Sequence, residues 1–206
     1  MIGFLGDIHG NFRSLRDVFK RHPDVTYWFQ VGDLGEPNKP YKYLPENFTF
    51  IQGNHENWDE IEKFRKKGDA LFLPNGEVRK FGEITVASFG GNYSPKFFRK
   101  KRSSICGDRR RHFLEEEVEK LKGYDGKIDV LLTHEAPSPY RPKDLDIGQE
   151  VITDLIEAIQ PKIHFFGHHH YYGQYGYKGV RSIGLDYGYK SFVMWDPETF
   201  ETKWTY

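Results

Sequence analysis

Five short polar motifs carry the residues of this sequence that could do chemistry. Each places Asp, Asn or His side chains in a turn: Gly6-Asp7-Ile8-His9-Gly10, Gly32-Asp33-Leu34-Gly35-Glu36, Gly53-Asn54-His55-Glu56, Thr133-His134-Glu135 and Gly167-His168-His169-His170. Imidazole nitrogens combined with carboxylate oxygens suit Mn, Fe, Co, Ni or Zn, and the lack of thiolates argues against a structural zinc site. Two such ions about 3.5–4 Å apart can share a carboxylate and a hydroxide and hold a phosphoryl group. The motifs therefore indicate a centre of two metal ions.

A strand-like apolar run precedes each of these motifs. The five runs are short and rich in aromatic or β-branched residues, at positions 1–6, 25–31, 48–52, 128–132 and 162–166. In open α/β sheets, ligands collect at the carboxyl ends of the strands. Glycines beside most of these turns permit tight backbone turns and close approach. We therefore expect the five motifs to converge on one site, although they are spread over most of the chain.

Elsewhere the apolar residues mark the helices and strands that must hold this site. Helices are predicted within residues 11–23, 58–68, 114–123 and 152–161, where apolar residues recur at helical spacing. Further short strands are predicted at 71–73, 78–81, 84–89, 180–185, 191–195 and 200–206, and the Tyr-rich residues 171–177 are predicted to form a structured loop. This order predicts an α/β fold with helices outside and sheet inside.

Composition restricts the class of protein. The chain has 206 residues, which suits one domain over residues 1–206. The formal net charge is +0, so no field of the whole molecule favours nucleic acid or a membrane. No apolar run is long enough to span a bilayer, and no signal-peptide pattern is present. Cys106 is the only cysteine, which excludes intrachain disulfides and predicts a cytoplasmic protein.

A strongly basic segment lies within a predicted loop at about residues 90–111. From Lys96 to Arg111 there are eight basic residues against one acidic residue, Asp108, a local charge of +7. One interpretation is a solvated surface loop. The other is a lid that grips a polyanionic substrate, a nucleotide or nucleic acid, with Tyr93, Phe97 and Phe98 available to stack on bases.

Taken in order, the five motifs resemble those of the calcineurin-like metallophosphoesterases: Gly-Asp-x-His, Gly-Asp-x-x, Gly-Asn-His-Glu, a Thr-His step and a terminal Gly-His-x-His. The resemblance assigns the metal ligands to two groups with one shared residue: Asp7, His9 and His170 for one ion, Asn54, His134 and His168 for the other, and Asp33 as the bridge. His55 would stand beside the scissile phosphate, as oxyanion stabiliser or leaving-group acid. The family fold is a four-layer αββα sandwich of two mixed sheets flanked by helices.

Differences from the motifs of known branches of this family limit which activity the sequence predicts. Where protein Ser/Thr phosphatases carry an Asp-Arg-Gly run and a second arginine, this chain has Glu36, Pro37-Asn38 and Gln52. Glu36 could still orient His55, but the phosphate-gripping arginines are absent from those positions. Purple acid phosphatases carry a tyrosine where Glu36 stands. Residues 90–93 and the pair Arg110/Arg111 are loosely similar to lariat-debranching phosphodiesterases, which usually carry cysteine at the position of Asp7.

These features predict a phosphoesterase that uses two divalent ions, Mn²⁺ first, and a hydroxide bridging them to hydrolyse phosphate esters. A phosphodiesterase is slightly favoured, because the arginine clamp is missing and a basic, aromatic segment is present. A phosphomonoesterase is the alternative within the same chemistry. An inactive interaction scaffold is the alternative from another class, but such scaffolds lose motif residues, and His55 is retained here. His169 lies between two ligands and is expected to point away from the metals.

Overall fold

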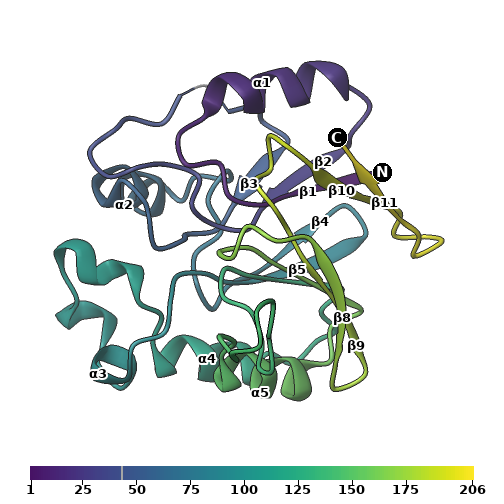
Figure 1. Ribbon diagram of the computed structural model, residues 1–206. Helices are drawn as coiled ribbons and strands as arrows, with labels where there is room; N and C mark the ends of the chain where they lie inside the picture. Colours follow the sequence, from purple (N-terminus) through teal and green to yellow (C-terminus); the bar gives the residue numbers. More distant parts are fainter. Residues whose placement is uncertain (43) are drawn as a thin grey trace.

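Two stacked β-sheets form the centre of the molecule in a computed structural model that describes residues 1–42 and 44–206 (Figure 1). One sheet has the order β11-β10-β1-β2-β3, with bounds β1 (Ile2–Leu5), β2 (Tyr27–Gln30), β3 (Phe48–Phe50), β10 (Phe192–Trp195) and β11 (Thr202–Thr205). The other has the order β4-β5-β6-β7-β9-β8, with bounds β4 (Val78–Phe81), β5 (Ile84–Phe89), β6 (Val130–Thr133), β7 (Ile163–Phe166), β8 (Gly173–Tyr177) and β9 (Val180–Gly184).

Both sheets are mixed and combine parallel with antiparallel strand pairs. In the first sheet β1, β2 and β3 are parallel, whereas β10 runs antiparallel to β1. In the second, β5, β6, β7 and β9 are parallel, and β4 and β8 pair antiparallel at the two edges. The carboxyl ends of β1, β2 and β3 therefore share one edge of their sheet, as do those of β6 and β7, which is the arrangement that the polar motifs require.

The main core lies between the two sheets. It joins apolar side chains from both, and the ring of Phe4 on β1 stacks on that of Phe165 on β7 with centroids 3.7 Å apart. Alternate residues of a strand face opposite sides of its sheet. On β2, Phe29 belongs to this core, while its neighbour Trp28 packs beneath the helices on the outer face. Both faces of the strands are thus buried, which explains why the sequence reads as continuous apolar runs.

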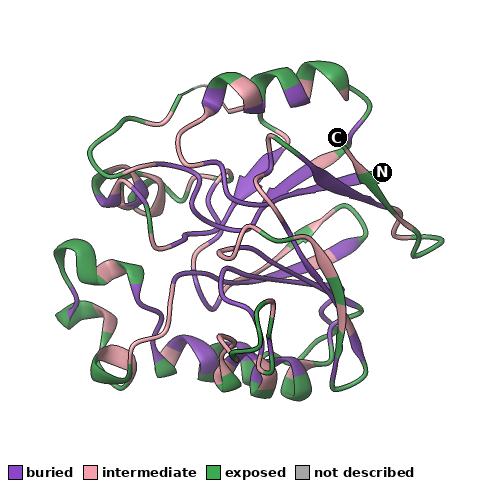
Figure 2. Ribbon diagram, in the orientation of Figure 1, coloured by how far each residue is buried: buried purple, intermediate pink, exposed green. Residues whose placement is uncertain are grey.

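Helices cover the outer face of each sheet (Figures 1 and 2). Helices α1 (Phe12–Arg21) and α2 (Trp58–Lys67) pack on the first sheet, and α4 (Glu115–Lys122) and α5 (Glu150–Ile159) pack on the second. Asn11 caps α1 by accepting a hydrogen bond from the Ser14 amide, and Gly68 ends α2 in the left-handed region. The predicted α/β architecture of two mixed sheets flanked by helices is confirmed.

Two local predictions were wrong. Residues 171–177 contain the edge strand β8, although they were expected to form a loop. Two glycines and an exposed side give β8 a weak strand signal, and its pairing with β9 supplies the order instead. Residues 71–73 form no strand, because only Phe72 pairs there, in an isolated bridge with Phe50.

The basic segment contains three short helices rather than an irregular loop: α3 (Pro95–Phe98), η1 (Arg102–Ser104) and η2 (Gly107–Arg111). Arg102 holds it to α4 by a 2.7 Å ion pair with Glu117 and by a 2.9 Å hydrogen bond to the His112 carbonyl. Tyr93 and Phe98 pack into the cluster beneath the second sheet, so these rings are engaged within the protein. Part of the basic charge is therefore used to fix the segment in place.

Candidate metal centre

A first group of candidate ligands forms where β1 and β7 end. Asp7 and His9 follow β1, and His170 follows β7 in the other sheet. The His170 Nε2 atom lies 2.8 Å from Asp7 Oδ2 and 3.1 Å from His9 Nε2, and His9 Nε2 lies 3.5 Å from the same Asp7 oxygen. One ligand atom of each residue lies within 4.8 Å of the others. This spacing lets all three contact one ion, and their mixed N and O donors suit a divalent transition metal.

A second group forms beside the first from the ends of β2, β3, β6 and β7. Asp33, His134 and His168 place their donor atoms within 4.8 Å of one another. Asn54 joins them, because its Oδ1 atom lies 2.8 Å from His134 Nε2. The other ring nitrogen of His134 lies 2.9 Å from the Val31 carbonyl, which fixes the ring orientation and leaves Nε2 facing the site.

Asp33 lies between the two groups. Its Oδ1 atom is 3.4 Å from His134 Nε2 in the second group, and its Oδ2 atom is 3.7 Å from His9 Nε2 in the first. The carboxylate is buried, and the His55 amide donates a 2.7 Å hydrogen bond to Oδ1. A single carboxylate thus presents one oxygen to each group, as a bridging ligand requires.

The protonation states of Asp7 and His168 also fit metal binding. Burial disfavours the charge on Asp7, but hydrogen bonds from His170 and His9 hold its pKa well below the usual range. Burial, together with neighbouring imidazoles, lowers the pKa of His168 to about 3. Asp7 is therefore a carboxylate and His168 a neutral imidazole at neutral pH, the forms that bind a cation.

Four of the seven candidate ligands have left-handed backbone conformations, which non-glycine residues seldom adopt. Their φ angles are 47° at His9, 57° at Asp33, 68° at His168 and 52° at His170. Backbone hydrogen bonds hold these turns, since the amides of Ile8 and His9 both donate to the Asp33 carbonyl at 2.9 Å. The strain is concentrated where the two groups meet, which is typical of a functional site.

Glu56 is a site residue that the sequence analysis did not assign a role. Its buried carboxylate accepts hydrogen bonds from the amides of Leu34 and Gly35 in one ligand turn and from that of Gly53 in the next, at 3.0–3.1 Å. The Tyr41 hydroxyl donates to the same carboxylate. Burial, followed by the charge of Asp33, raises the pKa of Glu56 to about 7. Its place in the Gly-Asn-His-Glu motif was the signal that could have identified it.

Glu36 was predicted to orient His55, but among the described residues no contact between the two side chains supports this role. Its carboxylate forms an ion pair with Lys39 instead, and within residues 1–42 and 44–206 no hydrogen bond joins it to His55. The side chain lies beside Gly10. The buried carboxylate that organises the His55 turn is Glu56.

His169 belongs to neither of the two groups, although its ring lies next to that of His168. Its ring stacks on that of Tyr140, with centroids 4.9 Å apart. It also lies with Glu135 and His168 in a third set of donors within 4.8 Å, which the sequence did not suggest. Since His168 already belongs to the second group, this set overlaps the main site.

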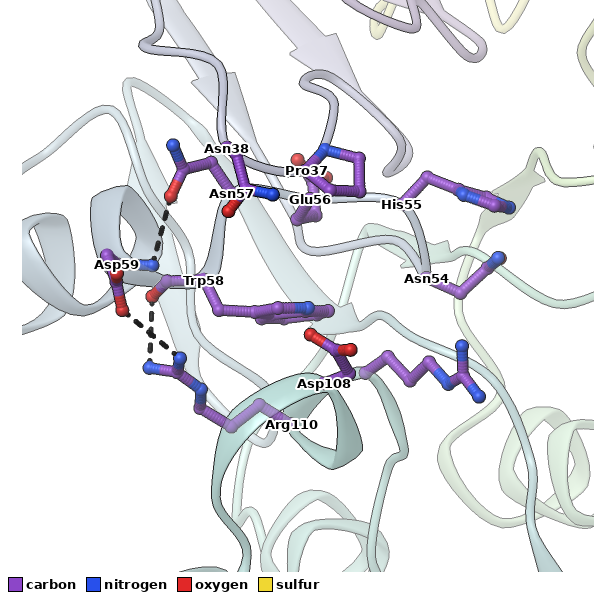
Figure 3. Close-up of a pocket in the computed structure, with 11 residues that line it drawn as sticks. Pro37, Asn38, Asn54, His55, Glu56, Asn57, Trp58, Asp59, Asp108 and Arg110 are labelled. Carbon is purple, nitrogen blue, oxygen red and sulfur yellow. Dashed lines mark hydrogen bonds and ion pairs between the residues drawn. The ribbon is translucent and has the colours of Figure 1, made fainter.

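A cavity of about 240 Å³ opens beside the second group (Figure 3). Asn54 and His55 lie at one end of it and Trp58 in its wall, and the cavity also borders Asn38 and Arg111. His55 is exposed, and its ring lies 5.6 Å from that of His9. The ligands form a partly buried floor, and His55 stands above it where a substrate would enter.

Comparison with known proteins gives a family and several relatives. The sequence profile of the calcineurin-like phosphoesterases matches residues 1–172. An uncharacterized protein of Haemophilus influenzae is 28% identical over 220 residues, covering 90% of this chain and 91% of that protein. The lariat debranching enzyme of Drosophila pseudoobscura pseudoobscura is 25% identical over 198 residues, which cover 78% of this chain and only 36% of that enzyme.

A solved structure shares the fold. The protein TT1561 of Thermus thermophilus superposes with a TM-score of 0.69 over 99% of this chain and 97% of its own length. The sequence identity is 12%, so this likeness concerns the fold alone. In the part of the chain that the structure describes, no helix combines the length and the apolar character that crossing a bilayer requires.

Proposed function

The chain belongs to the calcineurin-like phosphoesterase family, and from this premise we propose that it hydrolyses phosphodiesters at a centre of two metal ions. The family makes it a metal-dependent phosphohydrolase that acts on phosphate esters. The observation that carries the proposal is the position of Asp33, whose two carboxylate oxygens face two separate groups of donors.

The donor atoms fit two divalent transition ions. Asp7, His9 and His170 would hold one ion, and Asn54, His134 and His168 the other, with Asp33 shared between them. The set contains imidazole nitrogens and oxygens without thiolate, which suits Mn²⁺ as well as Fe, Ni, Co or Zn. Mn²⁺ is the first choice, and an activity profile across these metals would identify the native ion.

The chain's own residues prepare the phosphate for attack. Two bound ions would acidify a water molecule and screen the negative charge on the phosphoryl oxygens. Asp33 and Glu56 keep the two ligand turns in register, because their oxygens hold the amides of His55 and Gly53. His55 is exposed above this floor, in a position to stabilise charge on the phosphoryl oxygens or to protonate the leaving oxygen. Inactive scaffolds lose motif residues, so the presence of His55 favours an enzyme.

Two observations favour a diester over a monoester. The positions where protein Ser/Thr phosphatases hold arginines carry Pro37 and Gln52, so the clamp typical of those monoesterases is missing there. The cavity beside Asn54 and His55 gives room for a second substituent on phosphorus. A phosphomonoesterase remains the second candidate, because the metal ligands serve both reactions equally.

A panel assay tests this proposal. Bis(aryl) and mono(aryl) phosphates are compared under Mn²⁺, Ni²⁺, Zn²⁺ and Mg²⁺, and the diester is expected to have the higher kcat/KM. A kcat/KM on the diester that is equal to or lower than that on the monoester would contradict the proposed preference for diesters. Asp33→Asn should abolish hydrolysis while the circular dichroism spectrum stays native. Full activity of this variant with added Mn²⁺ would refute the bridging role.

A further inference from the structure

The residue that replaces an arginine in this chain holds the basic segment in place. Gln52 precedes the Gly53-Asn54-His55 turn, where protein Ser/Thr phosphatases carry an arginine. Its side-chain amide donates a 3.3 Å hydrogen bond to the Arg110 carbonyl on η2. Its own carbonyl accepts from the Gly91 amide at 2.8 Å, at the start of the same segment. Gln52 therefore fixes the distant basic segment against the metal-ligand turn.

Arg110 fixes the same helix from the other side. Its Nη1 atom donates a 3.1 Å hydrogen bond to the Trp58 carbonyl, and Nη2 lies 3.3 Å from Asp59 Oδ1 (Figure 3). A third hydrogen bond of 3.1 Å runs from Nε to the Gly107 carbonyl within η2. Each guanidinium nitrogen has a partner within the protein, and two of these contacts join η2 to α2, so Arg110 is a positioning residue rather than a ligand for substrate.

Arg111, the next residue, has a fixed backbone and an uncommitted side chain. Its carbonyl accepts a 2.9 Å hydrogen bond from the Asn92 amide. Its guanidinium lines the cavity that also borders Asn54 and His55, and it is exposed. Among the described residues, no hydrogen bond or ion pair engages that guanidinium, whereas Arg102 and Arg110 are each held by carboxylates.

We propose that Arg111 is the arginine that grips the phosphate group of the substrate. A guanidinium offers two parallel N–H groups that match two non-bridging oxygens, and such charge-assisted pairs are strong. Of the other carboxylates that line the cavity, Asp59 is paired with Arg110 and Glu56 is buried among its own donors, and no ion pair joins Asp108 to Arg111 among the described residues. The arginine missing from the sequence position is thus supplied from η2, across the cavity. This inference rests on the proposed phosphoesterase site.

Binding of inorganic phosphate to the Mn²⁺-loaded protein tests this inference without relying on turnover. In calorimetry, Arg111→Ala should weaken phosphate binding roughly ten- to a hundredfold, the loss typical of a charge-assisted contact. The phosphate affinity of Arg111→Lys should lie between those of the wild type and Arg111→Ala, because lysine keeps the positive charge but lacks the two parallel N–H groups of a guanidinium. Arg109→Ala is the matched control, since Arg109 lies on the same helix over the ring of Phe97 and outside the cavity. It should bind phosphate as the wild type does.

Added guanidinium separates a direct contact from a structural effect. It should restore phosphate binding and KM in Arg111→Ala, with bound Mn²⁺ unchanged throughout. Arg110→Ala should also raise KM, but guanidinium should not restore it, because Arg111 is still present and displaced. If Arg111→Ala binds phosphate with the affinity of the wild type, the inference is overturned, whatever rate of hydrolysis the variant shows. A wild-type protein that hydrolyses no ester under any metal would instead overturn the proposed function, and the calorimetry would still decide the role of Arg111.

Discussion

Replacing Glu56 by glutamine should loosen the two ligand turns that this residue holds together. The carboxylate accepts four hydrogen bonds in a buried place, from the amides of Leu34, Gly35 and Gly53 and from the Tyr41 hydroxyl. A glutamine keeps the shape but exchanges one acceptor oxygen for an NH₂ donor. Which of the two oxygens is replaced by NH₂ decides how much the free energy of unfolding falls.

The lower cost arises when the NH₂ group takes the place of Oε2. Tyr41 can then rotate its hydroxyl and accept, so only the Gly35 amide loses its acceptor, which costs about 1–3 kcal/mol in the free energy of unfolding. With NH₂ at Oε1, both Leu34 and Gly53 lose theirs, at about twice that cost. Glu56→Ala strands all three amides, a loss of about 3–9 kcal/mol that approaches the whole stability of a domain.

Urea unfolding at pH 5 measures this loss, because Glu56, whose pKa is raised to about 7, is then neutral in the folded chain and little of the cost of a buried charge enters the comparison. Glu119→Gln is the matched control, since Glu119 pairs with Lys122 on the exposed side of α4 and should change stability by less than about 1 kcal/mol. The order of stability should be wild type, then Glu56→Gln, then Glu56→Ala. If Glu56→Gln is as stable as Glu119→Gln, the carboxylate does not hold the turns.

Three further predictions concern catalysis, acid stability and the basic segment. His55→Ala should lower kcat about 10²–10⁴-fold with metal content unchanged by mass spectrometry, whereas a parallel loss of metal would mark His55 as structural. Burial lowers the pKa of His164 to about 3, so the unfolded chain binds a proton below about pH 6.5 that the folded chain excludes, and this group alone should lower stability by about 2 kcal/mol from pH 8 to pH 5. His164→Gln should reduce the total change in stability over this range by that amount in urea unfolding, and an unchanged pH slope would contradict the assignment. Arg99→Gln with Lys100→Gln should weaken oligonucleotide binding and flatten its salt dependence by about 0.7 in logarithmic slope per lost phosphate contact, while unchanged binding would make these cations a solvated surface.

The sequence predicted that the candidate ligands converge because the relevant signals are local. Asp7, Asp33 and His134 each follow an apolar run directly, and parallel strands must bring their carboxyl ends to one edge. The left-handed backbone of His9 and His168 was not predictable, since it is imposed by contacts between turns rather than by the residue type.

The missed features depend on contacts that are distant in the sequence. β8 is ordered by its pairing with β9, and its own residues carry little strand propensity. The basic segment is fixed by Glu117 on α4 and Asp59 on α2, so its charge count alone could not distinguish paired from free cations. Glu36 was predicted to orient His55 because of its place three residues after Asp33, whereas the buried hydrogen bonds of the neighbouring turns are accepted by Glu56.

The number and coupling of bound Mn²⁺ ions test the central claim most directly. Electron paramagnetic resonance of the protein titrated with Mn²⁺ should show two ions per chain with the spin coupling of a bridged pair, as expected if Asp33 spans both groups of ligands. Asp33→Asn should lose that coupling. A single ion per chain, or two ions without coupling in the wild type, would contradict the account.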